Sequence, residues 1–241
     1  MRANECAGVV YLQMMKPTND KNYHAILVDL LSNRAALKQD VYENTKKVFT
    51  EFKSVVSQEI EGIRKEVEDE RVRCKVISSG DFEIQIAVGS DILLFHMHTN
   101  VFRFEDEHPI WKTSYLEDNP GLGYFGIINI YNFLFDSIEY DRHDDVGYLI
   151  GRVFINKEGH FLVQGLGDIS LVYSNFFKNT LDAEKMTEIV QRACTFAVDF
   201  DSFAPPYQSV GAIRVQDMKN LLLNLKVQTG KRIGFKWNHK K

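Results

Sequence analysis

Two histidines, one residue apart, are the side chains in this sequence best placed to do chemistry. His96 and His98 lie in the apolar run LLFHMHT at residues 93–99. Imidazoles on one face of a strand can bind zinc or another divalent metal when a carboxylate lies nearby. In a second interpretation, each histidine is paired with an acidic residue on the neighbouring strand. The opposite strand decides between these interpretations.

The residues just before the histidines predict that strand. Apolar and polar residues alternate over 82–88, which is typical of a half-buried strand. Gly89-Ser90 favours a two-residue hairpin turn. Pairing the strands symmetrically about this turn places apolar residues opposite each other on one face, and a shift of one residue would destroy that match. The apolar pairs are Phe82 with Met97, Ile84 with Phe95, and Ile86 with Leu93.

The same register places an acidic residue opposite each histidine. Glu83 opposes His96 and Asp81 opposes His98, with Cβ atoms about 5 Å apart. We therefore expect cross-strand polar pairs with raised histidine pKa values, and no metal, because no zinc signature with standard spacing is present. The alternative is a zinc or other divalent-metal site made of His96, His98, Glu83 and Asp81, which would define a metal-dependent hydrolase. Loops would supply any further ligand: His108, Asp141, His143 or Asp145.

A second chemical motif, GxGxxG, is formed by Gly121, Gly123 and Gly126, with Asp141 about 20 residues further on. The dinucleotide fingerprint requires a strand, a turn and then a helix. Here the glycines follow a polar loop that contains prolines and lead into the β-branched run IINIY. We therefore interpret them as loop and strand-entry residues and expect no cofactor.

The segment before the hairpin predicts a long helix over residues 22–72. It has no glycine or proline between residues 21 and 61, and it would be about 75 Å long at 1.5 Å per residue. Either it breaks near Ser32-Asn33 and both parts pack on one core, or it packs on a second copy of the chain. An apolar seam of coiled-coil type indicates the second copy and a homodimer. That seam consists of Val48, Phe52 and Val55.

Residues 73–241 predict an α+β domain. Residues 1–21 form an N-terminal segment, and disorder is one of the states we expect for it. Runs of strands followed by helices indicate a single antiparallel sheet of about five or six strands, with C-terminal helices beside the long N-terminal one. The small-molecule sensor domains of the PAS and GAF kind are arranged similarly, an analogy of arrangement alone. Further strands are expected over 122–135 and 147–165, and helices from Asp182 and Val215. Between them we expect a long polar loop over 106–121, with room for one helical turn, and an acidic loop over 135–145.

Composition narrows the partners and the compartment. The net charge of −4 disfavours nucleic acid as the main partner, although the basic tail over 230–241 leaves a nucleic-acid-associated protein as an alternative. Three widely spaced cysteines and the lack of a long apolar run favour the cytoplasm, with no membrane contact. The leading hypothesis is a non-enzymatic, homo-oligomeric module that senses a small ligand or binds a protein through its sheet, near the 106–121 loop.

Overall fold

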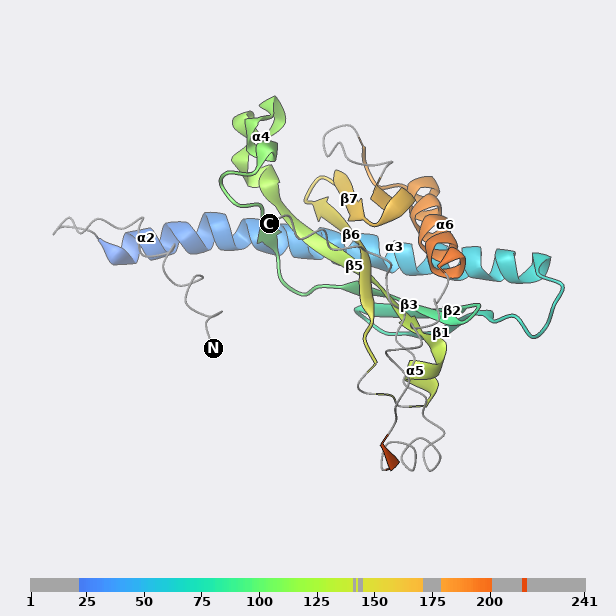
Figure 1. The fold of residues 1–241 in the computed structure, drawn as a ribbon. Helices are drawn as coiled ribbons and strands as arrows, with labels where there is room; N and C mark the ends of the chain where they lie inside the picture. The colour runs from blue at the N-terminus through green and yellow to red at the C-terminus, as the bar shows by residue number, and fades with distance from the viewer. Residues whose placement is uncertain (1–21, 141, 143–144, 171–178, 201–213, 216–241) are drawn as a thin grey trace, which may run out of the picture. The chain divides into compact units, whose positions relative to one another are not determined.

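The computed structural model describes residues 22–140, 142, 145–170, 179–200 and 214–215 (Figure 1). Most of the expected second C-terminal helix and all of the basic tail lie outside these residues. The chain divides into two compact units, Met1–Leu37 and Lys38–Lys241.

Helical residues run without interruption from Tyr23 to Glu66. They comprise α2 (Tyr23–Asp29), the π-helical turn η1 (Leu30–Ala35) and α3 (Ala36–Glu66). The expected break near Ser32-Asn33 is therefore a wider helical turn, of the kind that absorbs an extra residue without ending the helix. The helix ends at Glu66, six residues before the predicted end at residue 72.

Seven strands form one antiparallel sheet in the order β1-β2-β3-β5-β6-β7, with β4 also paired to β5. Because β5 is eleven residues long, it pairs with β3 along its second half and with the short β4 along its first. The α+β class and the single antiparallel sheet are as predicted, and the seventh strand comes from the two-residue β4. The strands are β1 (Cys74–Ser79), β2 (Glu83–Val88), β3 (Asp91–Met97), β4 (Phe102–Arg103), β5 (Tyr124–Leu134), β6 (Tyr148–Asn156) and β7 (Phe161–Gly165).

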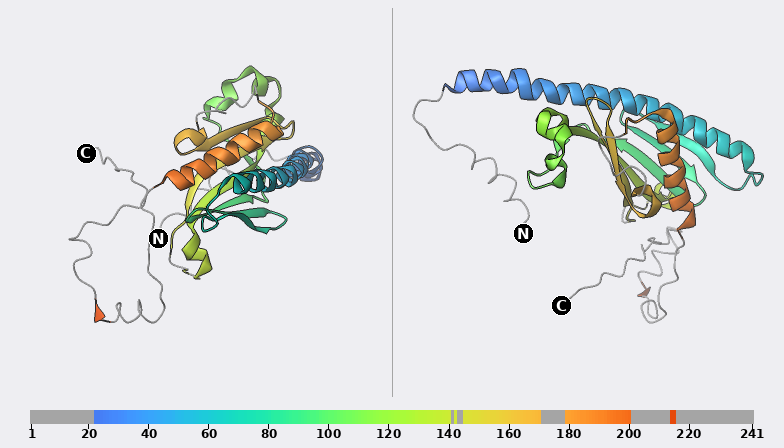
Figure 2. Two further views of the ribbon diagram at one scale, coloured as in Figure 1. Left: turned by 90° about the vertical axis from the view of Figure 1, so that its right-hand side faces the viewer. Right: turned by 90° about the horizontal axis from the view of Figure 1, so that it is seen from above.

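One face of the sheet is covered by α3 and by α6 (Ala183–Asp199), which lie side by side (Figure 2). Gln191 Nε2 of α6 donates a 2.7 Å hydrogen bond to Glu59 Oε1 of α3. The apolar faces of both helices enter the main core, where the ring of Phe52 lies 5.4 Å from that of Phe95 on β3. The start of α6 is capped by Asp182, which accepts a hydrogen bond from the Lys185 backbone N–H.

A glycine allows α3 to cross β5 at close range. A Cβ atom on Gly126 would lie 2.2 Å from Thr45 Oγ1 and 2.8 Å from Thr45 Cβ. Thr45 is fully buried, and its hydroxyl donates a 2.7 Å hydrogen bond to the carbonyl of Val41 one turn earlier. Gly126, predicted as a loop or strand-entry residue, lies near the start of β5 and serves helix–sheet packing.

The opposite face of the sheet is partly covered by the segment between β4 and β5. Its residues 106–121 were predicted as a long loop with room for one helical turn, and the segment contains three such turns: η2 (Pro109–Lys112), α4 (Ser114–Asp118) and η3 (Pro120–Gly123). The Trp111 ring lies over Gly123, where a Cβ atom would come within 2.3 Å of it. Apolar residues of the turns and of the sheet form a second, smaller core: Ile110, Leu116, Leu122, Phe125, Ile127, Phe154 and Leu162.

The predicted acidic loop also begins as a helix, α5 (Phe135–Glu139). The two strands predicted about Gly159 are confirmed as β6 and β7, and Gly159 adopts a φ of 80° in their turn. That left-handed conformation suits glycine because it has no Cβ.

Candidate functional site

A row of polar side chains crosses the face of the sheet that α3 and α6 leave uncovered. Strand pairing places Glu83 beside His96, His96 beside Asn129, Asn129 beside Arg152, and Arg152 beside Gln164. The row therefore runs through five neighbouring strands from β2 to β7. On one side it borders the apolar pair of Phe154 and Leu162, which belongs to the second core. A polar row beside an apolar surface is typical of a binding site, in which a few polar groups orient a largely apolar ligand.

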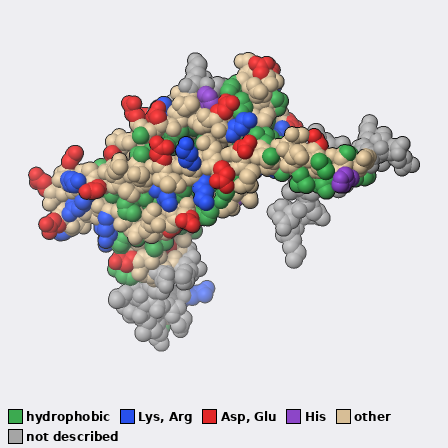
Figure 3. Space-filling view, turned by 180° about the vertical axis from the view of Figure 1, so that it is seen from behind, with side chains coloured by type: hydrophobic (Ala, Val, Ile, Leu, Met, Phe, Trp, Pro, Cys, Tyr) green, Lys and Arg blue, Asp and Glu red, His purple; other side chains and the backbone are tan. Residues whose placement is uncertain are grey.

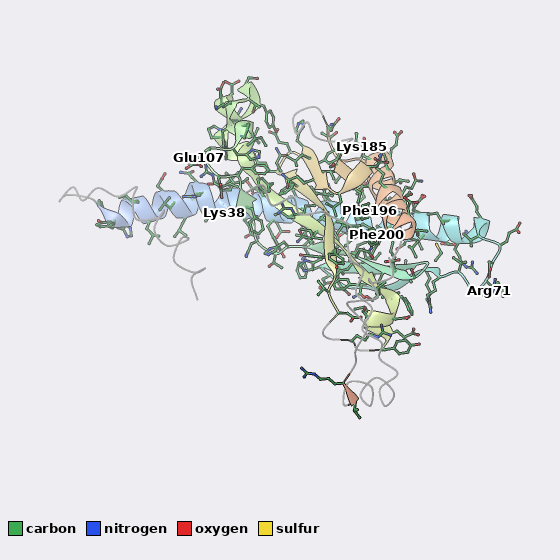
Figure 4. The ribbon with its side chains drawn as sticks, in the orientation of Figure 1. Lys38, Arg71, Glu107, Lys185, Phe196 and Phe200 are labelled. Carbon is green, nitrogen blue, oxygen red and sulfur yellow. The ribbon has the colours of Figure 1, made fainter. Side chains whose placement is uncertain are left out.

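A groove of about 480 Å³ opens at the β6–β7 end of this row. One wall is the segment from Phe102 to His108, which includes β4 and the turn after it, and Glu107 of this wall is labelled in Figure 4. The volume lies within the range of roughly 300–1,000 Å³ that small-molecule sites occupy. The groove is lined by Phe102, Arg103, Phe104, Glu105, Glu107, His108, Phe125, Ile127, Arg152, Phe154 and Gln164.

Arg152 supplies the cation of the groove. Its side chain is half-buried on β6, and Nη2 donates a 2.8 Å hydrogen bond to Gln164 Oε1 on β7. The guanidinium carbon lies 5.2 Å from the centroid of the Phe154 ring, within the range of a cation–π contact. Among the described residues, no carboxylate forms an ion pair with Arg152.

Aromatic rings form the apolar surface next to Arg152. Phe104 packs between two strand residues, with ring centroids 4.4 Å from Phe125 and 5.5 Å from Phe154. The His108 ring stacks on Phe104 at 4.3 Å, with an angle of 18° between the ring planes. The wall is held in place by the Glu105 carbonyl, which accepts hydrogen bonds from the Trp111 side chain and the His108 backbone. These contacts orient the Phe104 and His108 rings within the wall.

The hairpin that carries His96 and His98 has the predicted register. All six pairs of the ladder follow it, from Val88 with Asp91 to Glu83 with His96, and Gly89 in the turn has a φ of 59°. The predicted pair of Asp81 with His98 does not form, because β2 begins only at Glu83 and Asp81 is exposed before it. His98 instead donates its backbone N–H to Ile127, and its ring packs on Phe102 at 4.8 Å.

The pKa of His96 moves in the opposite direction to the prediction. Burial lowers it from its ordinary value of 6.5, and the neighbouring His98 lowers it further, while Glu83 only partly opposes these effects. The Glu83 carboxylate accepts hydrogen bonds from Gln85 and Ser78, and the described residues contain no ion pair between Glu83 and His96. The imidazole thus loses hydration without gaining a close charged partner.

The alternative prediction, a metal site at His96 and His98, finds no complete set of ligands among the described residues. No group of three or more His, Cys, Asp or Glu side chains in that part of the chain is arranged to hold a metal ion. The His96 and His98 rings lie edge to face with centroids 6.4 Å apart. His108 faces the groove, Asp145 accepts a hydrogen bond from Ser137, and the other two candidate ligands, Asp141 and His143, lie outside the described residues.

The residues of the predicted dimer seam contact the chain's own sheet. Phe52 is fully buried and Val55 is 9% exposed, and both belong to the main core. Val48 is half-buried against the same core. Because intramolecular contacts occupy this seam, helix pairing between two copies would need other residues. Within residues 22–37, the described part of the N-terminal unit, the exposed large apolar side chains are Tyr23, Leu27, Val28, Leu30 and Leu31.

Sequence reasoning missed Arg152, Gln164 and the Phe104 wall. The alternation of apolar and polar residues along β6 and β7 contained a partial signal. With a turn at Gly159, it predicts how these two strands pair, just as alternation about Gly89-Ser90 predicts the first hairpin. Nothing local indicates that β5 lies between β3 and β6, and this is what brings Arg152 into one row with His96.

Comparisons with known protein families, with curated proteins and with solved structures found no match for this chain. Within the described part of the chain, no helix combines the length and the apolar character that a membrane span requires.

Proposed function

We propose that this chain is a non-enzymatic binding module that senses a small ligand or binds a protein partner through the groove on the open face of its sheet. One observation supports this above the others: a preformed groove of about 480 Å³ combines fixed aromatic walls with a single half-buried guanidinium. Such a combination of apolar surface and few polar groups is what small-molecule sites share. The groove borders the start of the 106–121 segment, near which the sequence predicts contact with a ligand or protein partner.

A neutral apolar dye tests whether the groove binds ligands. N-phenyl-1-naphthylamine fluoresces when it leaves water, so titration into the full-length protein should give a saturable increase with one site per chain. Gln164→Trp places an indole in the groove and should abolish this signal, since Gln164 lines the cavity. Gln85→Trp is the matched control, because Gln85 lies on the same face of the sheet but not in the groove. Equal dye binding by both variants would contradict the proposal.

The second part of the proposal is a homodimer formed by the N-terminal helical segment. Tyr23, Leu27 and Leu30 follow each other at spacings of four and three, and Leu31 lies beside Leu27. All four are at least 40% exposed (hydrophobic side chains are green in Figure 3). An apolar stripe at this spacing is typical of a helix that pairs with another helix, and a second copy of the same segment presents a matching stripe.

The dimer is tested by light scattering of the full chain at micromolar concentration. A mass of about twice 27.8 kDa is expected for the wild type. Leu27→Glu together with Leu31→Glu should yield a monomer with unchanged thermal stability of the folded domain, because both side chains are more than half exposed. Ala25→Glu is the control, because Ala25 is exposed on the side of the same helix opposite the stripe. A wild-type monomer would refute this part of the proposal.

We further propose that this module is cytoplasmic. Cys74 and Cys194 are buried free thiols. Unpaired cysteines are typical of proteins in reducing compartments. Localisation of a fluorescent fusion protein would test this assignment, and secretion of the chain would contradict it.

A further inference from the structure

We infer that the groove selects an organic monoanion: a carboxylate carried by a flat, apolar body. This inference rests on the proposed binding function and adds the chemical class of the ligand. It begins from the charge of Arg152, which the described residues leave without a paired carboxylate although the side chain is half-buried beside a Phe ring. A cation in that position is most stable when an anion shares the site.

The geometry of the guanidinium favours a carboxylate. Arginine has five N–H donors in a planar fork, and the described residues provide an acceptor for one bond only, at Gln164 Oε1. The bond to Gln164 and the contact with Phe154 restrain the fork from two sides. A planar fork of this kind matches the two oxygens of a carboxylate, which can accept parallel hydrogen bonds from it.

The aromatic walls favour a flat apolar body next to the carboxylate. The rings of Phe104, Phe125 and Phe154 lie within 4.4–5.5 Å of one another and line the same groove. Flat ligands stack against such rings or meet their edges at similar centroid distances. A molecule with two fused rings and one carboxylate would fit a volume of about 480 Å³.

The charges at the groove favour one negative charge over two. Glu105 and Glu107 line the groove and are exposed, so a dianion bound at Arg152 would be repelled by two carboxylates. The second arginine of the groove, Arg103, already forms an ion pair with Asp106 at 2.6 Å. Only Arg152 therefore offers an uncompensated cation among the described lining residues, and we expect inorganic phosphate to bind poorly.

Two compounds of the same shape isolate the effect of charge. NMR titrations of the full-length protein with 2-naphthoate and with the neutral 2-naphthamide should show tighter binding of 2-naphthoate by roughly tenfold or more, as expected for hydrogen bonds to a charged group. Inorganic phosphate at equal concentration should not compete. Arg152→Gln should reduce the affinity for 2-naphthoate to that for 2-naphthamide. Arg73→Gln is the matched control and should change the affinity less than about twofold, because that guanidinium also lies over a Phe ring, 4.0 Å from the centroid of Phe135, but does not line the groove.

A second variant covers the case in which Arg152→Gln does not fold. Gln164→Glu retains the arginine but places a carboxylate at its hydrogen-bond partner, so the preference for 2-naphthoate should again be lost. Equal binding of the two compounds by the wild type, or a preference that survives both substitutions, would overturn the inference. Failure of 2-naphthoate to bind would also overturn the inference. If N-phenyl-1-naphthylamine still binds when 2-naphthoate does not, the proposed binding function stands and only the preference for an anion is refuted. If neither compound binds, the proposed function and the inference are both refuted.

Discussion

Replacing Gly126 by alanine tests the packing of α3 on the sheet. The new Cβ would lie 2.2 Å from Thr45 Oγ1, 2.6 Å from Cγ2 and 2.8 Å from Cβ. Ordinary contacts between carbon atoms are about 3.5–4.0 Å. A change of rotamer cannot relieve the contact with Thr45 Cβ, so α3 and β5 must separate. We therefore expect Gly126→Ala to strain the main core along the whole line of contact.

The size of the effect follows from two opposing contributions. Overpacking of a core costs about 1–3 kcal/mol. The upper end of this range applies because the new Cβ on β5 meets Thr45 Cβ on α3, and each of these atoms is bonded directly to the backbone. Alanine is favoured over glycine within a strand by about 0.5–1 kcal/mol. The net loss is about 2 kcal/mol, which corresponds to a decrease of about 4–8 °C in melting temperature for a domain of this size.

Urea unfolding, followed by circular dichroism, measures this loss for the single and double variants. Thr45→Ala removes two of the three contacting atoms, so in the double variant it should restore at least about 1 kcal/mol relative to additivity. Gly62→Ala is the control within α3, because a Cβ atom at that position would have no other atom within 4 Å. There alanine should stabilise by about 0.5–1 kcal/mol. An unchanged midpoint for Gly126→Ala, or strict additivity with Thr45→Ala, would refute the packing argument.

Three further measurements test the hairpin, the histidine and the thiols. Ile84→Asp should cost about 3–5 kcal/mol of unfolding free energy, because Ile84 is fully buried, whereas Glu83→Lys should cost less than about 1 kcal/mol; equal losses would mean that the two faces are exchanged. The folded pKa of His96 lies below its unfolded value, so the unfolded chain binds more protons between the two values, and stability should decrease as the pH falls from about 6.5 through the folded pKa. NMR titration locates that pKa, and His96→Gln should flatten this pH dependence; a folded pKa above 6.5 would contradict the reasoning. Burial raises the pKa of Cys74, and that of Cys194 to about 12. Once Cys6, the third cysteine of the chain, is replaced by serine, iodoacetamide at pH 8 should therefore label neither buried thiol before unfolding.

The sequence alone determined the features that depend on neighbours along the chain. The hairpin register followed from alternation on both sides of Gly89-Ser90, because a shift of one residue would have moved every apolar side chain to the wrong face. The long helix, the helix after Asp182 and the strands about Gly159 were likewise predictable from local periodicity. The α+β class followed from the order of these elements.

Tertiary structure decided what depends on residues far apart in the sequence. Helical spacing showed that Phe52 lies on an apolar face, but a helix presents the same face whether its partner is a second chain or its own sheet. The pKa of His96 depended on burial and on the direction in which Glu83 turned, neither of which register reveals. The groove required β6 and the wall after β4 to meet across β5, a contact that only the folded chain creates and that leaves Arg152 facing the aromatic rings.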